Sequence, residues 1–288
     1  METAKPNSER FIKTKLFIND YKSNRRAMTG LFMLIFIVLV AFAADIIAPY
    51  SPTAFIDNPL VAPNSSYLLG TDQLGRDVFS RIIHGTRVSL SIGIVAATIS
   101  GLTGTLIGVF AGYFGGNVDR VLSQIIDVFI MLPTFFLIIL VTAIFSSNLF
   151  YMMLVIGFTS WPGNARVMRS QTLSLKERTF VKGARAIGTP ELKILFSYIV
   201  PNGIFPVISN TTMQVATAIL TEASLSFLGL GDPNAVTWGQ MIFNGRNNMV
   251  VAPWVALFPG IAIIITVATF YLIGDGLNIV LNPKLRSK

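Results

Sequence analysis

A stretch of 38 residues without a single charge, Val128 to Ala165, constrains the fold of this chain more than any other feature. As one α-helix it would be about 57 Å long, whereas about 20 apolar residues are enough to cross a bilayer. The stretch must therefore turn back within itself. The polar sequence Ser146-Ser147-Asn148 is the break that allows the turn. We expect two membrane-spanning helices on either side of it.

The composition of the whole chain also indicates a membrane protein. Of the 288 residues, 52% are hydrophobic and 12% are charged, whereas a soluble domain has about 25% charged residues. The chain has no cysteine, which excludes disulfides, a thiolate nucleophile and thiolate metal ligands. A single histidine without cysteine also argues against a resident metal site.

The same reasoning predicts an all-α polytopic membrane protein with six transmembrane helices. The other four helices are expected in the apolar runs 27–44, 88–117, 194–221 and 247–274. The first of these runs follows a polar and basic segment and is long enough to span, so we expect a retained helix rather than a cleaved signal peptide. The predicted organisation is a cytoplasmic N-terminal arm (1–26), a first transmembrane helix (27–46), an extracytoplasmic segment with an interfacial helix (47–87), a five-helix core (88–280) containing a cytoplasmic loop (163–193), and a cytoplasmic tail (281–288).

The distribution of positive charge predicts the orientation. Six spans place both termini on one side, and that side would hold 18 of the 22 Lys and Arg residues. Because Lys and Arg are enriched in cytoplasmic loops, both termini and the loop between the fourth and fifth spans are expected inside the cell. The net charge of +8 is therefore interpreted as a consequence of the membrane topology, with most Lys and Arg residues on the cytoplasmic side.

The basic stretch Phe180 to Ile194 has the pattern of two short helices joined by a turn. Gly188 can adopt the left-handed conformation that ends a helix. Thr189 can cap the next helix, Pro190 suits its first position, and Glu191 favours its positive end.

Three interpretations of this stretch compete. It could be a solvated loop that fixes the topology. A DNA-binding helix-turn-helix needs a free surface to enter the major groove, whereas this stretch is tethered to a span at each end. The third interpretation is a docking element for a cytoplasmic protein, because its small residues allow another surface to approach closely: Gly183, Ala184, Ala186 and Gly188.

The stretch resembles the EAA loop of ABC importer permeases, which has a Glu-Ala-Ala triplet, a glycine four residues after the last alanine, and a Leu-Pro further on. Lys182-Gly183-Ala184 stands at the triplet, Gly188 at the glycine and Pro201 at the proline. In that family the loop forms a coupling helix that sits in a groove on the ATPase subunit. The resemblance implies the following coupling residues: Lys182, Gly183, Ala184, Ala186, Gly188, Thr189 and Pro190. Lys182 departs from the family's glutamate, so we expect docking by shape.

Longer motifs narrow the resemblance. "LLGTDQLGRDVFSRIIHGTRVSLSIG" (Leu68 to Gly93) and "LTEASLSFLGLGDPNAVTWGQM" (Leu220 to Met241) resemble the second of the two permeases in dipeptide, oligopeptide and nickel importers. "AGYFGGNVDR" (Ala111 to Arg120) and "IGDGLNIVLNPKLR" (Ile273 to Arg286) match as well, with Asn282 where the family carries aspartate. This resemblance implies a type I ABC importer transmembrane domain.

The function implied by the resemblance is ATP-driven import of di- or oligopeptides. Nickel or a metal–metallophore complex is the alternative cargo, and a membrane-anchored scaffold or sensor is the alternative of a different class. The expected partners are a second homologous permease, two cytoplasmic ATPase subunits, an extracytoplasmic substrate-binding protein and the lipid bilayer of the cytoplasmic membrane, with no nucleic acid. The sequence has no GxxxxGK[ST] phosphate loop, so the chain is expected to be non-catalytic, with ATP and Mg²⁺ bound by the ATPase subunits.

Several polar residues near the spans are further candidates. Asp127 lies a few residues into the third span, where a carboxylate is costly, and we favour structural pairing over a proton relay. Pro133 is expected to kink that span. Residues 71–85 form an amphipathic pattern typical of an interfacial helix, with His84 solvated at its end.

The end of the fifth span carries the other candidate residues. Glu222 is expected near the outer mouth of the translocation path, where capping or a local contact is the favoured role over substrate binding. The same candidate group comprises Glu222, Ser224, Ser226 and Asp232. In the second span, small residues recur at Gly93, Ala97, Gly101, Gly104 and Gly108, which predicts close helix packing within the chain or against a second permease.

Overall fold

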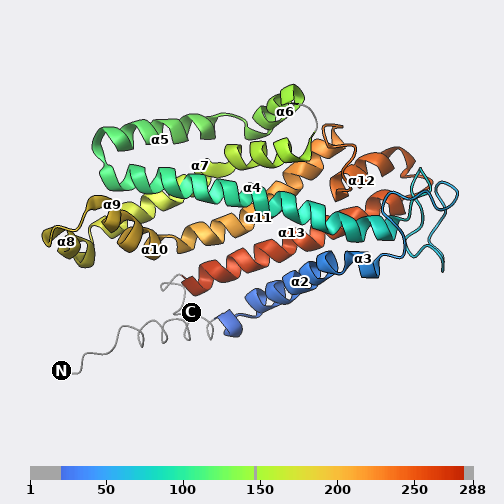
Figure 1. The fold of residues 1–288 in the computed structure, drawn as a ribbon, viewed down its shortest axis with the longest axis horizontal. Coiled ribbons are helices and arrows are strands. Elements are labelled where there is room, and N and C mark those ends of the chain that lie inside the picture. The colour runs from blue at the N-terminus through green and yellow to red at the C-terminus, as the bar shows by residue number, and fades with distance from the viewer. Residues whose placement is uncertain (1–20, 146–147, 282–288) are drawn as a thin grey trace.

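The computed structural model describes residues 21–145 and 148–281 and is built from helices that run along one long axis (Figure 1). No β-strand occurs in these two ranges, apart from an isolated bridge between Thr71 and Asp77. The predicted all-α fold is therefore confirmed. The helices are α2 (Arg25–Phe42), α3 (Ala44–Ile47), α4 (Val78–Phe114), α5 (Gly116–Met131), α6 (Thr134–Phe145), α7 (Leu149–Lys176), α8 (Thr179–Ala186), α9 (Glu191–Ile194), α10 (Val200–Gly203), α11 (Phe205–Phe227), α12 (Trp238–Gly245) and α13 (Trp254–Leu281).

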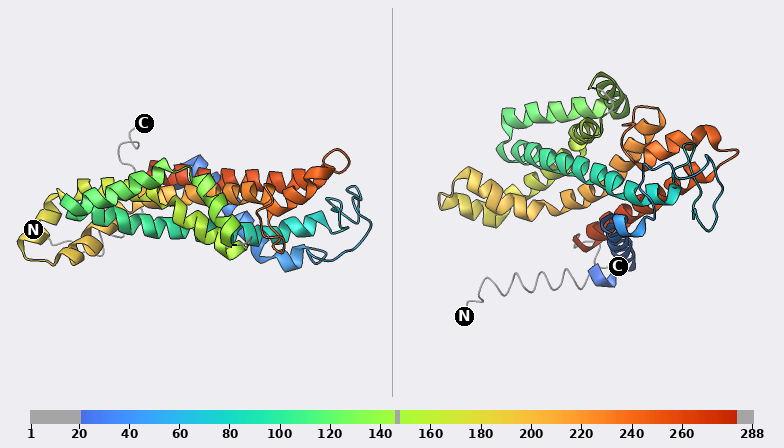
Figure 2. Two further views of the ribbon diagram at one scale, coloured as in Figure 1. Left: turned by 90° about the horizontal axis from the view of Figure 1, so that it is seen from above. Right: turned by 45° about the vertical axis from the view of Figure 1, so that its right-hand side comes forward.

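The two ends of the bundle differ in character. One end carries the short helices α8, α9 and α10, and we call it the hairpin end; the other carries α3, α12 and residues 48–77, and we call it the loop end (Figures 1 and 2). The start of α2 and the end of α13 both point toward the hairpin end, and Arg26 and Asp275 approach each other there to 3.7 Å. The two described ends of the chain thus share one side, as an even number of crossings requires.

The six-span prediction is not confirmed in full. Three helices of the described chain, α2, α4 and α13, are long and apolar enough to cross a membrane, and two bent pairs, α5 with α6 and α9–α10 with α11, bring the number to five. The helix that does not qualify is α7, which has 28 residues but carries Arg166, Arg169 and Lys176 in its second half.

The charge-free stretch from Val128 to Ala165 is divided where the sequence predicts breaks. Ser146 and Ser147 lie outside the described residues, but Asn148 caps α7, since its side chain accepts a hydrogen bond from the Phe150 N–H at 2.8 Å. A second break separates α5 from α6 at Pro133, with a bend of 84°. Proline has no N–H to continue a helix and forces the preceding residue into an extended conformation, so the predicted kink at Pro133 is confirmed.

The central helix is α4, and its small residues let two neighbours approach closely. A Cβ added at Gly104 or Gly108 would lie 2.5 Å from Asn164 or 2.3 Å from Ala165 of α7, and one at Gly93 would lie 2.8 Å from Val215 of α11. The predicted stripe therefore serves packing within the chain, because no larger residue fits between these helices.

The structure corrects the expectation of a separate interfacial helix over residues 71–85. The helix begins at Val78, capped by Asp77, and continues into α4 without a break. Arg81 is buried with an exposed fraction of 3% and donates to the Pro52 carbonyl at 2.7 Å, because residues 48–77 cover this part of α4. His84 is not at a helix end either; it lies inside α4, largely covered, 3.9 Å from Asp45.

Candidate coupling hairpin and candidate path

The segment 179–194, which we call the coupling hairpin, is built by a glycine-terminated helix. Gly188 has φ = 77°, its N–H donates to the Arg185 carbonyl at 3.0 Å, and the Thr189 N–H donates to the Ala184 carbonyl at 3.1 Å. This pair of bonds is the Schellman ending of α8. The predicted stop at Gly188 is confirmed. The predicted cap at Thr189 is wrong, because Pro190 occupies the N-cap of α9 and no side chain caps that helix.

The seven predicted coupling residues do not share one face. Val181 and Ala184 are buried in the cluster that α8 forms with Met168 and Ile194. Lys182, Gly183, Ala186, Gly188 and Pro190 are exposed, and Thr189 is half-buried. A Cβ added at Gly183 or Gly188 would meet no atom within 4 Å. The outer surface of the hairpin is thus small and open, and Ala184 belongs to its inner side.

Phe180, Ile187 and Leu192 are exposed large apolar side chains of the hairpin, and the last two are the most exposed. Ile187 is 81% exposed and Leu192 is 56% exposed, on either side of the Gly188 turn. Sequence reasoning passed over both, although an isoleucine beside the helix-ending glycine was a readable signal. Exposed apolar residues flanked by small ones are typical of a surface that another protein covers.

Polar contacts hold the hairpin against the end of α4. Tyr113 donates a hydrogen bond to the Glu191 carboxylate and accepts one from Arg185 at 3.3 Å, and Arg185 also pairs with Glu191 at 3.4 Å. The Arg185 guanidinium lies 5.7 Å from the centre of the Tyr113 ring. The hairpin is therefore fixed to a long helix instead of hanging from flexible loops.

The lysine that replaces the family's glutamate has a partner within the chain. Lys182 Nζ lies 3.0 Å from Glu177 Oε2, and both side chains are mostly exposed. The hydrogen bond from Lys182 holds the pKa of the Glu177 carboxyl below its ordinary value. The positive charge on the hairpin surface is thus partly compensated by a carboxylate five residues earlier.

Two ion pairs join α5 to α7. Arg169 binds Asp119 with two hydrogen bonds, at 2.6 and 2.7 Å, and Ser123 adds a third bond to Asp119 at 3.0 Å. Nearer the middle of the helices, Arg166 Nη2 donates to Asp127 Oδ1 at 2.9 Å. The predicted pairing of Asp127 is confirmed.

The four candidate residues near the end of α11 have three different environments. Glu222 is 1% exposed and accepts hydrogen bonds from Ser226 at 2.7 Å and from Thr237 at 2.8 Å. Ser224 points away and bonds to the Leu220 carbonyl, and Asp232 accepts the Leu149 N–H at the start of α7 at 3.1 Å. The structure brings Glu222 and Ser226 together as a brace between α11 and α12, and Asp232 acts as a cap.

A pocket of about 390 Å³ lies between α5, α6, α7 and α11, and we call it the hydroxyl pocket. None of the described residues that line it carries a charge. They are Phe129, Ile130, Thr134, Phe135, Ile138, Thr159, Ser160, Pro162, Gly163, Thr217 and Thr221. Sequence reasoning missed this site, although hydroxyl residues recurring in the apolar runs were a usable signal.

A buried polar cluster beside this pocket joins three helices. Asn164 of α7 is fully buried and donates to Gln214 of α11 at 2.7 Å and to Ser100 of α4 at 3.2 Å. Asn210 donates to Asn164 at 2.8 Å. Because buried polar groups are costly unless they are paired, this cluster fixes how α4, α7 and α11 sit together.

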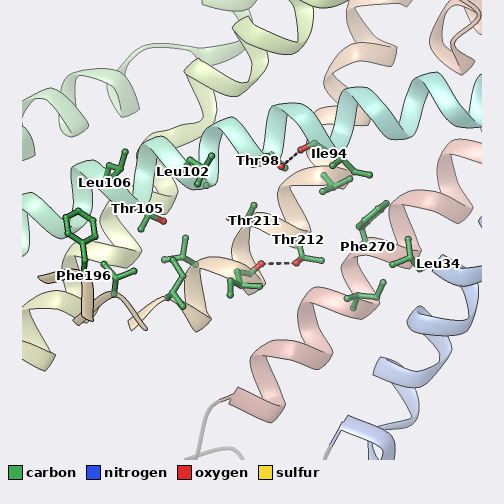
Figure 3. Close-up of a pocket in the computed structure, with 18 residues that line it drawn as sticks. Leu34, Ile94, Thr98, Leu102, Thr105, Leu106, Phe196, Thr211, Thr212 and Phe270 are labelled. Carbon is green, nitrogen blue, oxygen red and sulfur yellow. Dashed lines mark hydrogen bonds between the residues drawn. The ribbon is translucent and has the colours of Figure 1, made fainter. Parts of the chain in front are cut away.

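A larger pocket, of about 700 Å³, opens between α2, α4, α11 and α13. Figure 3 shows its lining, in which Leu34, Leu102, Phe196 and Phe270 provide apolar walls. Two of its threonines have their hydroxyl groups bonded to their own helices, as the dashed line from Thr98 to Ile94 illustrates. This pocket is mainly apolar, and none of the described residues that line it is charged.

These features define a class: a helical membrane protein with long apolar helices, a small hydroxyl-lined pocket between them, and a braced hairpin at one end. The chain belongs to the family of binding-protein-dependent transport system inner membrane components, which matches residues 104–287. Residues 14–66 match the N-terminal transmembrane domain of oligopeptide transport permease C. The chain is thus a non-catalytic permease subunit of an ABC importer, as the motifs predicted.

Curated relatives match nearly the full chain. The glutathione transport system permease protein GsiD of Pectobacterium atrosepticum is 41% identical over 261 residues, covering 90% of this chain and 86% of the relative. The GsiD protein of Escherichia coli O6:K15:H31 is 39% identical, with coverages of 94% and 90%. The dipeptide transport system permease protein DppC of Alkalihalophilus pseudofirmus is 37% identical, with coverages of 92% and 88%.

A solved structure confirms the fold. A chain of the MetNI methionine ABC transporter, in an inward-facing conformation, superposes with a TM-score of 0.55 at 18% sequence identity, covering 69% of this chain and 94% of the other. At this identity the likeness concerns the fold alone, and it supports the predicted type I ABC importer transmembrane architecture.

Proposed function

We propose that this chain is the permease subunit of an ATP-driven importer of di- or oligopeptides and forms half of the translocation path. The observation that carries the proposal is the identity of 37–41%, over about nine-tenths of the chain, to permeases named for glutathione and dipeptide transport. The hydroxyl pocket agrees with such a cargo, because side chains of many kinds can pass a wall of hydroxyl groups and aromatic rings.

The coupling hairpin is the contact through which the chain receives energy from ATP. Its open surface at Lys182, Gly183, Ala186 and Gly188, with Ile187 beside it, would enter a groove on a cytoplasmic ATPase subunit. Ala184 shapes the hairpin from its inner side, the half-buried Thr189 from the turn, and the exposed Pro190 from the start of α9. ATP and Mg²⁺ would be bound by the two ATPase subunits. The hairpin end is therefore cytoplasmic in this proposal, in agreement with the Lys and Arg distribution.

The loop end faces outward in this arrangement. A substrate-binding protein would deliver its cargo there, and a second, homologous permease would complete the path. Glu222 and Ser226 would keep α12 in place at the outer mouth. Movement of the hairpin would reach this end through α4, α7 and α11, because the Asn164 cluster makes these helices move together.

A bulky residue at Gly183 tests the coupling role. We expect Gly183→Trp to leave the protein inserted and folded, since a side chain there meets no atom of the chain, and to reduce peptide uptake by the reconstituted complex about tenfold or more by blocking the groove. Ser174→Trp, at an exposed position near the end of α7, is the matched control and should transport normally. A normal rate of peptide uptake by the Gly183→Trp complex would refute the coupling role.

A further inference from the structure

The ion pair between Asp127 and Arg166 has an unusual position. Asp127 is the twelfth residue of α5, about 16 Å along the helix from its start. Its side chain is 54% exposed and that of Arg166 is 59% exposed. Charged groups within membrane-spanning segments face a bundle interior or water because lipid cannot solvate them. The face of α5 and α7 that carries this pair therefore does not face lipid.

A second ion pair on the same two helices provides the contrast. Asp119 and Arg169 are 21% and 32% exposed, and their carboxylate and guanidinium bind each other through two parallel hydrogen bonds. Asp127 and Arg166 share one hydrogen bond, and the described part of the chain supplies neither with another. Asp119–Arg169 thus has the geometry of a structural brace, whereas Asp127–Arg166 keeps oxygen and N–H groups available to a ligand.

The exposed pair adjoins the hydroxyl pocket. Ile130 lies three residues after Asp127 on α5, and Gly163 lies three residues before Arg166 on α7; both line the pocket. Residues three apart on a helix are surface neighbours. The pair is therefore about one helical turn from the pocket, on the side of the hairpin end.

The two sites differ in what they can bind. In the hydroxyl pocket, Thr159, Ser160 and Thr221 already donate their hydroxyl hydrogens to carbonyls of their own helices, at 2.7–2.8 Å. Their oxygens remain as uncharged acceptors. Beyond the pocket, Asp127 offers a carboxylate suited to an ammonium group and Arg166 a guanidinium suited to a carboxylate. A free peptide carries both of these groups at neutral pH.

We propose that Asp127 and Arg166 form an ionic site on the cytoplasmic side of the hydroxyl pocket, where the charged termini of the peptide exchange with the ion pair during release. This rests on the proposed function as a peptide permease. It assigns the α5–α7–α11 face, and not the larger apolar pocket, to the translocation path. Substitution at either residue is expected to slow transport through loss of charge.

The absence of cysteine from this chain allows a test by chemical restoration of charge. Arg166→Cys and Asp127→Cys are introduced separately into the complete complex in proteoliposomes, and uptake of radiolabelled dialanine is measured. Loss of one charge-assisted contact is expected to lower the uptake rate about tenfold. A trimethylammonium methanethiosulfonate should restore transport by Arg166→Cys, and the sulfonate reagent should restore transport by Asp127→Cys, whereas the opposite reagent should not.

Two controls separate an ionic role from a structural one. Phe32→Cys on α2, which is 64% exposed on an apolar helix, should not react with either water-soluble reagent. The exchange variant Asp127→Arg/Arg166→Asp keeps the ion pair and should assemble, so it replaces a single variant that fails to fold. Its peptide uptake should still be reduced, because each terminus of the peptide meets a group of the wrong charge.

The outcomes distinguish this inference from the function on which it rests. If the unaltered complex takes up no peptide, the proposed function fails. If the unaltered complex transports but positions 127 and 166 do not label, the face is covered and the ionic site is wrong. Labelling with equal effects of both reagents, or full uptake by the exchange variant, also overturns it.

Discussion

At the scale of single residues, two glycines of the coupling hairpin should respond in opposite directions to the same substitution. A Cβ added at either position would meet no atom within 4 Å. The backbone conformation therefore decides whether the substitution stabilises or destabilises the hairpin. Gly183→Ala should stabilise α8 by about 0.5–1 kcal/mol, since glycine is a poor helix residue. Gly188→Ala should destabilise the hairpin by about 1–2 kcal/mol, because φ at this position is 77°.

Hydrogen exchange of the amides in residues 179–194 checks this pair of variants in the assembled complex. We expect slower exchange in Gly183→Ala and faster exchange in Gly188→Ala, each by several-fold. A change of the same sign in both variants would mean that the hairpin does not end α8 at Gly188 in the membrane.

Residue-scale prediction from sequence succeeded where the backbone itself demands a residue type and failed where packing decides. Gly188 as a helix stop was predictable because no other residue adopts its conformation easily. The inward position of Ala184 was not, because α8 has small residues on several sides and the sequence does not show which side meets α4. The cap at Thr189 failed for a related reason, since the Schellman bonds use the Thr189 N–H and place Pro190 at the start of α9.

At the scale of helices, Tyr113 should decide how firmly the hairpin is attached to α4. Tyr113→Phe removes the hydroxyl that links Glu191 and Arg185 and is expected to cost about 1–2 kcal/mol of local stability. Limited trypsin digestion should then cleave after Lys182 or Arg185 several times faster. Tyr271→Phe, at a partly exposed tyrosine of α13, should leave the digestion rate unchanged. Equal digestion rates for both variants would show that apolar packing alone holds the hairpin.

The predictable features of the helices are those that depend on residues close together in the sequence. The breaks at Pro133 and Asn148 follow from local chemistry, and the close packing of α4 follows from its stripe of small residues. The hydroxyl pocket and the Asn164–Gln214 contact were not predictable. They join residues about 50 positions apart, and a single sequence does not show which helices become neighbours. The hydroxyl residues indicate that a polar pocket exists, but the sequence does not show which helices line it.

At the scale of the whole molecule, α7 decides the topology. It carries the link between the pocket and the hairpin, yet it is the long helix that length and apolarity do not qualify as a span. Its charged half is compensated, because Arg166 and Arg169 pair with Asp127 and Asp119 of α5. Pairing of these charges with a neighbouring helix, and contact of the exposed pair with water, lower the cost of placing them at membrane depth. We therefore expect α7 to cross the membrane.

Cysteine labelling can decide this crossing directly. Asn148 precedes α7 and Ser174 lies near its end, and both side chains are exposed. If α7 spans the bilayer, an impermeant maleimide should label Asn148→Cys from outside and Ser174→Cys from the cytoplasmic side. Labelling of both from one side would make α5, α6 and α7 a re-entrant unit and leave four crossings, made by α2, α4, the bent pair of α9–α10 with α11, and α13. Four crossings would also keep the start of α2 and the end of α13 on one side, so the position of these ends does not decide between the two arrangements. This single pair of variants therefore tests the crossing of α7, on which the assignment of the α5–α7 face to the translocation path depends.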